Sequence, residues 1–195
     1  MSFRPTKKRN ILKLTGPAGL GVCLTCIMKF FEENGLDYNK DISLYLNSSG
    51  GSDSAYIPFM SKLTYECHVN LPDKETSTFI NRDLHQTLDQ NYEKFGVKSN
   101  KNCNLTTVVR NHNRCSSFCS LLFLLGQKRL LGPTGQIGLH AATGVHEPDM
   151  PAWYAAYGVN YEWVDRIRHV FNSYRMTYFM GPLLKDVGFA TKMIR

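Results

Sequence analysis

Short apolar segments with the two-residue period of a β-strand alternate along this chain with segments that have the period of a helix. The strand-like segments are residues 10–16, 41–47 and 105–109, and the two short ones on either side of Gly-Pro-Thr-Gly at 132–135. Helical apolar periods run over residues 22–33 and 53–63, and residues 117–126 are long and apolar enough for a buried helix. Because repeated strand–helix–strand units form a parallel sheet with crossover helices, this order predicts an α/β protein.

The length and composition predict one domain. The chain has 195 residues, of which 43% are hydrophobic and 20% are charged, so it can bury a sizeable core. We expect residues 1–195 to form a single domain that is interrupted by a polar insertion at about 65–103 with a weak helical pattern of its own. A longer helical pattern from about 160 to 178 predicts a helical C-terminal section.

The distribution of charge argues against a nucleic-acid partner. The formal net charge is +7, but residues 7–9 are the only run of basic side chains, and no basic stripe alternates with aromatic residues. No uninterrupted apolar stretch reaches the roughly 18 residues of a membrane span. Lys13 and Gly16-Pro17 interrupt the apolar segment after the basic run, so we do not interpret it as a signal peptide. We therefore expect a cytoplasmic location, with the periplasm or export as the alternative.

The six cysteines are few for a disulfide scaffold of this length. Cys23 and Cys26 have neither a second cysteine pair nor histidines at zinc spacing, so they are interpreted as buried structural thiols, and no metal site is expected. Cys67 and Cys103 bracket the polar insertion and could form a disulfide in an oxidising compartment.

Three polar segments that contain glycine or serine follow predicted strands, where the active sites of α/β proteins form. They are NSSGGS at 47–52, RCSSFCS at 114–120 and LHAATG at 139–144. A serine near residue 117 would stand at a helix start, His140 ends a strand and could act as its base, and the glycine pair could offer an oxyanion donor. Each feature also has a structural interpretation, as a helix N-cap, a strand end or a turn.

Two stretches that contain these segments resemble the proteolytic subunit of Clp proteases. DISLYLNSSGGS is similar to a strand that ends in Asn-Ser-Pro-Gly-Gly, with Ser49 in place of the proline. CSSFCSLLFLLGQKRLLGPTGQIGLHAATG resembles the serine turn, apolar helix, Lys-Arg pair, proline turn and histidine-ending strand of that family. The CSSFC turn also resembles bacterial Clp-like proteins with Cys-Ala-Ser-Ala-Cys. The resemblance covers most of residues 10–190 outside the insertion and implies the ClpP/crotonase-like α/β fold, a spiral of repeated βαβ units with a helical C-terminal section.

The resemblance assigns roles to four residues. It implies that Ser117, the third residue of CSSFC, is the nucleophile and that His140 is the general base. The backbone N–H groups of Gly51 and Phe118 are implied to form the oxyanion hole.

The neighbours of Ser117 receive no catalytic role. Ser116 falls on a position that is usually alanine in the family. Cys115 and Cys119 are four residues apart on one helix face, which indicates that they pack together or pair structurally rather than attack a substrate.

A third catalytic member is not evident. By the resemblance, the family's acid would fall near Ile194, which cannot serve. Asp186 and Asp165 are the nearby carboxylates, but neither matches the family's position. Asp165 is followed by Arg166 and Arg168 on a helical pattern, which is typical of a solvated ion pair.

These observations lead us to expect a Clp-like serine peptidase, a serine endopeptidase without a metal or organic cofactor, that acts on peptides or unfolded proteins. The resemblance implies a homo-oligomer, with residues 150–180 as a candidate contact, and leaves any unfoldase partner unknown. Two alternatives remain open: a weak or inactive relative that binds peptides or serves in assembly, and an acyl-CoA enzyme of the crotonase type.

Overall fold

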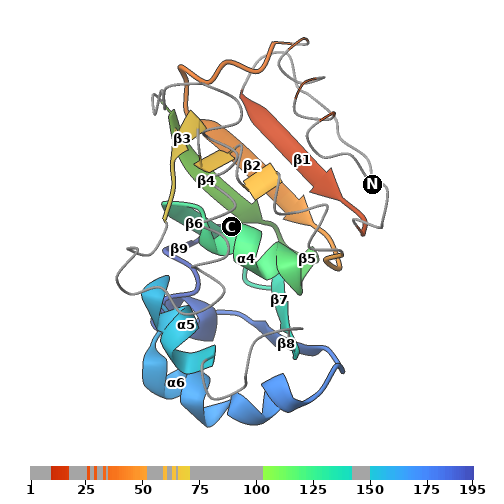
Figure 1. Ribbon diagram of the computed structural model, residues 1–195, viewed down its shortest axis with the longest axis vertical. Coiled ribbons are helices and arrows are strands. Elements are labelled where there is room, and N and C mark those ends of the chain that lie inside the picture. Colours follow the sequence, from red (N-terminus) through yellow and green to blue (C-terminus); the bar gives the residue numbers. More distant parts are fainter. Residues whose placement is uncertain are drawn as a thin grey trace, which may run out of the picture.

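The computed structural model is a mixed α/β structure with a mostly parallel sheet and a few helices (Figure 1). It describes residues 10–17, 35–51, 66–70, 103–141 and 150–195, and also residues 26, 29, 33, 59–60 and 63–64. Most of the predicted insertion, including its predicted helix, lies outside these residues, so the expectation of one domain with an insertion stays a prediction.

The larger sheet has the strand order β1-β2-β4-β6-β9, and every pairing in it is parallel. Its strands are β1 (Ile11–Thr15), β2 (Ile42–Asn47), β4 (Cys103–Val109), β6 (Lys128–Leu131) and β9 (Lys192–Met193), and β3 (Cys67–His68) pairs with β4 off this path. Strands β1, β2, β4 and β6 confirm the predicted strands. These four strands lie side by side in the order of the chain. Because β2 and β4 are parallel neighbours, their carboxyl ends point the same way.

Alternating burial explains why these segments form strands. In β1, Leu12 and Leu14 are fully buried, and in β2 the same is true of Ile42, Leu44 and Leu46, while the intervening residues are partly exposed. This period of two places one face of each strand in the hydrophobic core.

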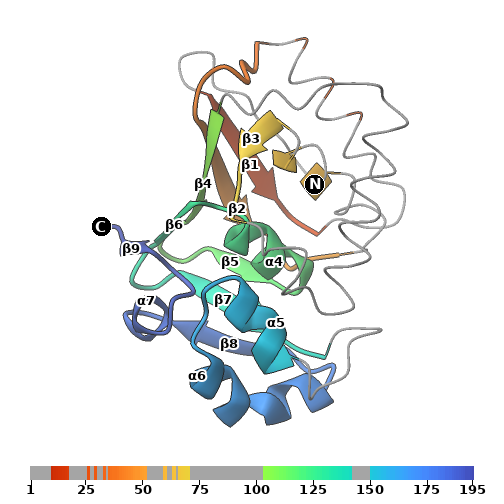
Figure 2. The same ribbon diagram turned by 60° about the vertical axis from the view of Figure 1, so that its left-hand side comes forward.

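A smaller sheet contains the strands that precede Ser117 and His140. It consists of β5 (Arg114–Ser116), β7 (Gln136–Leu139) and β8 (Thr177–Met180), with β5 parallel and β8 antiparallel to β7. A bridge between Ser48 and Cys115 connects it to the end of β2. Helix α4 (Phe118–Leu124) follows β5 directly, between the two sheets (Figure 2).

The C-terminal section differs from its prediction. It contains α5 (Met150–Ala156), α6 (Tyr161–Arg166), the 3-10 helix η3 (Arg168–Asn172) and α7 (Leu183–Asp186). The predicted long helix at 160–178 is wrong, because it breaks after Arg166 and its last two residues belong to β8. Residues 177–180 alternate in burial and pair with β7, so pairing in the folded chain overrides the helical period.

Two other predicted helices are only partly described. Residues 26, 29 and 33 are helical, as are residues 59–60, 63–64 and 66, which extends the second predicted helix beyond residue 63. The interpretation of Cys26 as a buried thiol is wrong, because this residue is exposed and disulfide-bonded, and Cys23 lies outside the described residues. Exposure at a helix surface leaves the cysteine open to oxidation rather than packed in the core.

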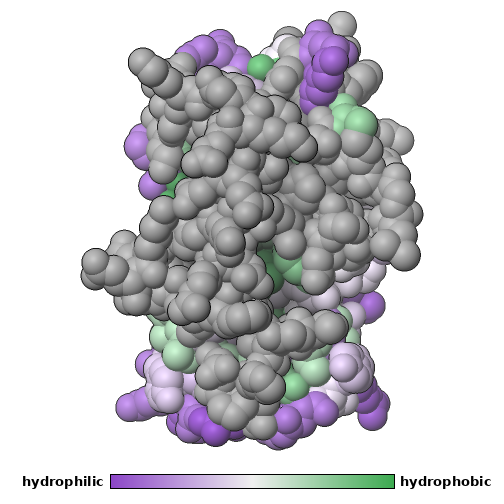
Figure 3. Space-filling model, viewed as in Figure 1, coloured by the Kyte–Doolittle hydropathy of each residue, from purple (hydrophilic) through white to green (hydrophobic). Residues whose placement is uncertain are grey.

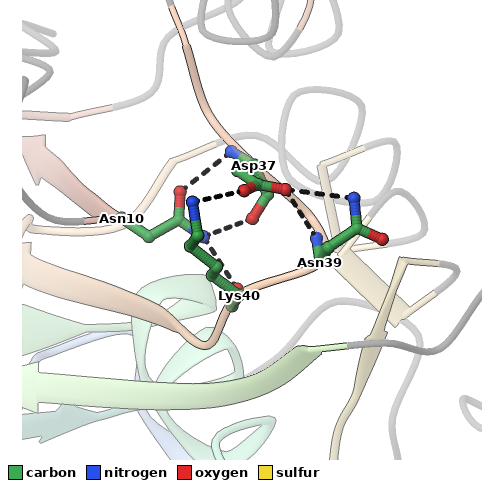
Figure 4. Close-up of polar contacts among 4 residues, drawn as sticks. All are labelled: Asn10, Asp37, Asn39 and Lys40. Carbon is green, nitrogen blue, oxygen red and sulfur yellow. Dashed lines mark hydrogen bonds and ion pairs between the residues drawn. The ribbon is translucent and has the colours of Figure 1, made fainter.

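A polar cluster closes the opposite end of the strands from the serine turn (Figure 4). The side-chain amide of Asn10 donates to the carbonyls of Asp37 and Lys40, and the carboxylate of Asp37 accepts from the backbone N–H of Asn39. The hydrogen bond and ion pair with Lys40 hold the pKa of Asp37 below its usual range. These contacts fix the turn that leads into β2, and so have a structural role.

The surface shows no membrane-spanning element in the described part of the chain. None of its helices is both long and apolar enough to cross a bilayer. In the view of Figure 3, hydrophilic side chains gather at the lower end of the molecule, where Figure 1 shows the C-terminal helices.

Candidate active site

Ser117 stands between β5 and α4 in an uncommon backbone conformation. Its φ is 55° and its ψ is −131°, and only one other described residue that is not glycine, His112, has a positive φ. A non-glycine residue in such a conformation costs on the order of 1–3 kcal/mol and persists only where its surroundings hold it. The serine turn is therefore a tight strand-to-helix junction of the kind that presents a nucleophile.

Hydrogen bonds hold both peptide groups of Ser117. Its N–H donates to the carbonyl of Gly138 at 2.9 Å. Its carbonyl accepts from the backbone N–H of Ser120 at 2.8 Å and from the hydroxyl of Ser120 at 2.6 Å. Ser117 does not cap α4 with its side chain, so its hydroxyl is available for another partner.

That partner is His140. Strands β5 and β7 are parallel neighbours with Ser116 opposite Gly138, so the residues that follow them emerge at the same edge of the sheet. Oγ of Ser117 and Nε2 of His140 lie 2.7 Å apart, within hydrogen-bond distance. With the serine hydroxyl as the donor, Nε2 is the unprotonated nitrogen, which is the arrangement a general base requires.

The glycine turn packs directly against the serine turn. A Cβ placed on Gly50 would lie 2.6 Å from Cβ of Ser117 and 3.3 Å from the backbone nitrogen of Phe118, and Gly50 has a φ of 93°. Only glycine fits here, on grounds of both space and conformation. Gly50 therefore lies against both Ser117 and the start of α4, and Gly51, which follows it directly, is exposed.

The other nitrogen of His140 has no partner in the described residues. Nδ1 is buried and makes no hydrogen bond there. Burial lowers the pKa of His140 below its ordinary value of 6.5, and the backbone of Ala141 offsets this by a smaller amount. The net lowering of the pKa favours the neutral imidazole at physiological pH.

The segment that lies beside His140 contains no carboxylate. The N–H of Ala141 donates to the carbonyl of Ser173, and Leu139 is paired with Thr177, so residues 173–177 flank this strand end. Residues 173–180 include no Asp or Glu.

The structure also places the residues that were considered for a third member. Asp165 forms an ion pair with Arg168, and Asp186 is exposed in α7; neither is hydrogen-bonded to His140. Ile194 extends β9 and donates its N–H to Leu131 in the larger sheet, whereas His140 ends a strand of the smaller one. The segment beside the histidine comes from β8 and the turn before it, which the helical prediction for 160–178 concealed.

Supporting residues that the sequence analysis did not identify are Gly138 and Ser120. A Cβ on Gly138 would lie 2.6 Å from Oγ of Ser116, so this glycine lets β7 approach the serine turn. Ser120 holds the carbonyl of Ser117, as described above. A glycine two residues before the histidine was the visible signal for the first, whereas nothing in the sequence distinguished Ser120.

Two disulfides are defined by the described residues, one at this site and one at the start of β4. Cys115 is bonded to Cys119, and Cys67 is bonded to Cys103 across β3 and β4. The sequence left open whether Cys67 and Cys103 are bonded, and the structure shows that they are. Cys115 and Cys119 form a disulfide, so they pair with each other as one of the two expectations had it. Among the described residues, no group of three His, Cys, Asp or Glu side chains forms a potential metal site.

Comparison with known proteins adds no identification to this geometry. No protein-family model matches the chain, and no curated protein matches it.

Proposed function

We propose that the chain is a Clp-like serine peptidase with the spiral of βαβ units found in the ClpP/crotonase fold. The order of the parallel sheet supports this fold, because β1, β2, β4 and β6 lie side by side in the order of the chain. The observation that carries the activity is the 2.7 Å contact between Oγ of Ser117 and Nε2 of His140, at a strained strand-to-helix turn.

The proposed reaction is acyl transfer through the serine. Oγ of Ser117 attacks the carbonyl carbon of a peptide bond while Nε2 of His140 accepts the hydroxyl proton. The oxyanion accepts hydrogen bonds from the backbone N–H groups of Gly51 and Phe118. When the C–N bond breaks, the proton on Nε2 passes to the leaving amine, and the acyl group stays on Ser117 as an ester. A water molecule, deprotonated by His140, then hydrolyses the ester and restores the serine.

A fluorophosphonate probe tests this assignment, because it phosphonylates an activated serine and releases fluoride. We expect the wild type to be labelled, and Ser117→Ala and His140→Ala to lose the label. Ser116→Ala is the matched control: Ser116 is the adjacent serine but is fully buried, so its removal should leave labelling unchanged. Folded wild type that takes no label, or label that remains in Ser117→Ala, would overturn the proposal.

A second candidate function has an observation in its favour. Because Nδ1 of His140 has no carboxylate partner in the described residues, the pair would act as a dyad or as the remnant of a site in a peptide-binding relative. Disrupting the orienting acid of a complete triad lowers turnover by about 10⁴-fold. A peptide that binds saturably to the wild type without being cleaved would favour the binding function over the peptidase.

The proposed partners follow from the resemblance. We propose that the chain associates with copies of itself through its C-terminal section. Exposed apolar side chains there support this, notably Tyr174, which is 79% exposed, and Met180, which is 51% exposed. Light scattering of the purified chain tests it, and a monomer at every concentration would contradict it.

The disulfides bear on the compartment. Disulfides form and persist in oxidising environments, so Cys67–Cys103 and Cys115–Cys119 favour the periplasmic or exported alternative over the cytoplasm. We propose an oxidising compartment, which thiol labelling of the protein in its native cells would test: free thiols at these four cysteines would contradict it.

A further inference from the structure

The disulfide between Cys115 and Cys119 encloses the serine turn. Cys115 lies in β5 and Cys119 in α4, their Cα atoms are 5.1 Å apart, and both side chains are fully buried. Ser117 is the central residue of the five that this bond joins into a ring. The bond therefore fixes the two ends of the segment whose middle residue has the strained φ of 55°.

The elements on either side of Ser117 have little stability of their own. Strand β5 has three residues and α4 has seven, which is about half the length at which an isolated helix becomes even marginally stable. The hydrogen bonds to Gly138 and Ser120 hold the peptide groups of Ser117 only while β5 and α4 keep their relative placement. A covalent tie between Cys115 and Cys119 supplies that placement at the junction itself.

We propose that Cys115 and Cys119 are positioning residues of the serine site, whose disulfide keeps Ser117 in the conformation that directs Oγ at Nε2 of His140. The effect of this disulfide on the reactivity of Ser117 rests on the function proposed above. The reactive form of the site is then the oxidised form, and the serine loses reactivity when the bond is absent even though the chain remains folded.

The second disulfide offers a matched control within the same chain. Cys67 and Cys103 are also fully buried and also bonded, and they join neighbouring strands. Cys103 begins β4, whereas β5 follows the other end of that strand, so this bond lies a full strand length from the serine turn. A general effect of losing a buried disulfide would appear in both pairs, and a positioning effect only in the first.

The experiment compares Cys115→Ala/Cys119→Ala with Cys67→Ala/Cys103→Ala. The measured quantity is the second-order rate constant for fluorophosphonate labelling, with far-UV circular dichroism to establish folding. We expect the first variant to react about 100-fold more slowly than the wild type, the loss that a misplacement of about 1 Å can produce. The second variant should react within about twofold of the wild type, because its bond does not touch the turn. If the first variant is unfolded, Cys115→Val/Cys119→Ala fills the strand position with a good strand former and repeats the test.

A readout that does not depend on activity separates the two proposals. The NMR titration of the His140 imidazole reports its hydrogen bond with Ser117, and we expect it to change in Cys115→Ala/Cys119→Ala and not in the control. Wild type that resists the probe would overturn the proposed function, while the change at His140 would still support positioning. A folded Cys115→Ala/Cys119→Ala variant with wild-type labelling and an unchanged His140 titration would overturn the positioning role.

Discussion

At the scale of single residues, the proposed chemistry depends on the protonation of one imidazole. His140 faces Ser117 through Nε2, and its Nδ1 is buried without a partner in the described residues. A carboxylate at Nδ1 would raise the pKa of the ring. Among the described residues the larger effect on the pKa of His140 is burial, which lowers it, and the backbone of Ala141 offsets this in part.

This leads to a prediction about pH. The burial of His140 places its pKa below 6.5, so the neutral, competent form persists into mildly acidic solution. We expect the labelling rate to be constant near neutrality and to fall with acidification, with a midpoint below 6.5. Folding stability should follow the same direction: the unfolded chain binds this proton first, so the contribution is intact above 6.5 and is lost as the pH falls through the folded pKa. Labelling rates from about pH 4 to pH 8 check this, and a midpoint at or above 6.5 would contradict it.

The two residues of the candidate site were predictable from sequence motifs. The neighbours that a third segment of the chain brings to the site were not. Ser117 and His140 could be proposed because the CSSFC turn and the strand that ends in His140 resemble segments of a known family. The segment beside the end of β7 could not be predicted, because it comes from residues 173–177, which were interpreted as part of a helix. The contact between Gly50 and Ser117 likewise depends on two turns meeting in space.

At the scale of elements, the site is a junction of two turns. The turn after β2 approaches the turn after β5 so closely that Gly50 has no room for a side chain. Gly35 has a similar backbone conformation, with a φ of 99° against 93°, but nothing within 4 Å of an added Cβ in the described part of the chain. Comparing substitutions at Gly35 and Gly50 therefore separates the free-energy cost of a positive φ from the cost of steric overlap with the serine turn.

We predict that Gly50→Ala damages both stability and reactivity. Gly35→Ala should lower the free energy of unfolding by about 1–2 kcal/mol, because alanine is strained at positive φ. Gly50→Ala should lower it by a further 1–3 kcal/mol or so for the overlap with Ser116 and Ser117, and should also slow labelling. Urea unfolding and labelling rates of both variants check this, and a Gly50→Ala variant that reacts like Gly35→Ala would contradict it.

The elements themselves illustrate where periodicity succeeds and fails. The parallel strands were predictable because apolar residues alternate within them, and this local pattern agrees with the burial of one strand face in the folded sheet. The segment 160–178 combines an apolar helical period with β-branched and aromatic residues. Whether its end forms a helix or a strand depends on whether a partner strand lies nearby. Strand β7 supplies that partner for residues 177–180, which no local pattern reveals.

At the scale of the whole molecule, the disulfides Cys67–Cys103 and Cys115–Cys119 differ in the length of chain that they close. Cys67 and Cys103 are 36 residues apart, whereas Cys115 and Cys119 are four apart. Because a disulfide stabilises largely by restricting the unfolded chain, the longer loop is expected to contribute more to the free energy of unfolding. The shorter loop contains the residue with the proposed chemistry, so stability and reactivity should depend on different bonds.

We therefore predict that the double variant with the greater loss of unfolding free energy is the one with the smaller loss of labelling rate. Chain entropy gives a loss of about 4 kcal/mol for Cys67→Ala/Cys103→Ala and about 2 kcal/mol for Cys115→Ala/Cys119→Ala. The labelling rate should fall only in the second, because only that bond holds the serine turn. Urea unfolding and labelling of the same samples measure both quantities below the unfolding transition. If the variant with the greater loss of stability is also the one that loses reactivity, the site depends on global stability, and the division between the two bonds is wrong.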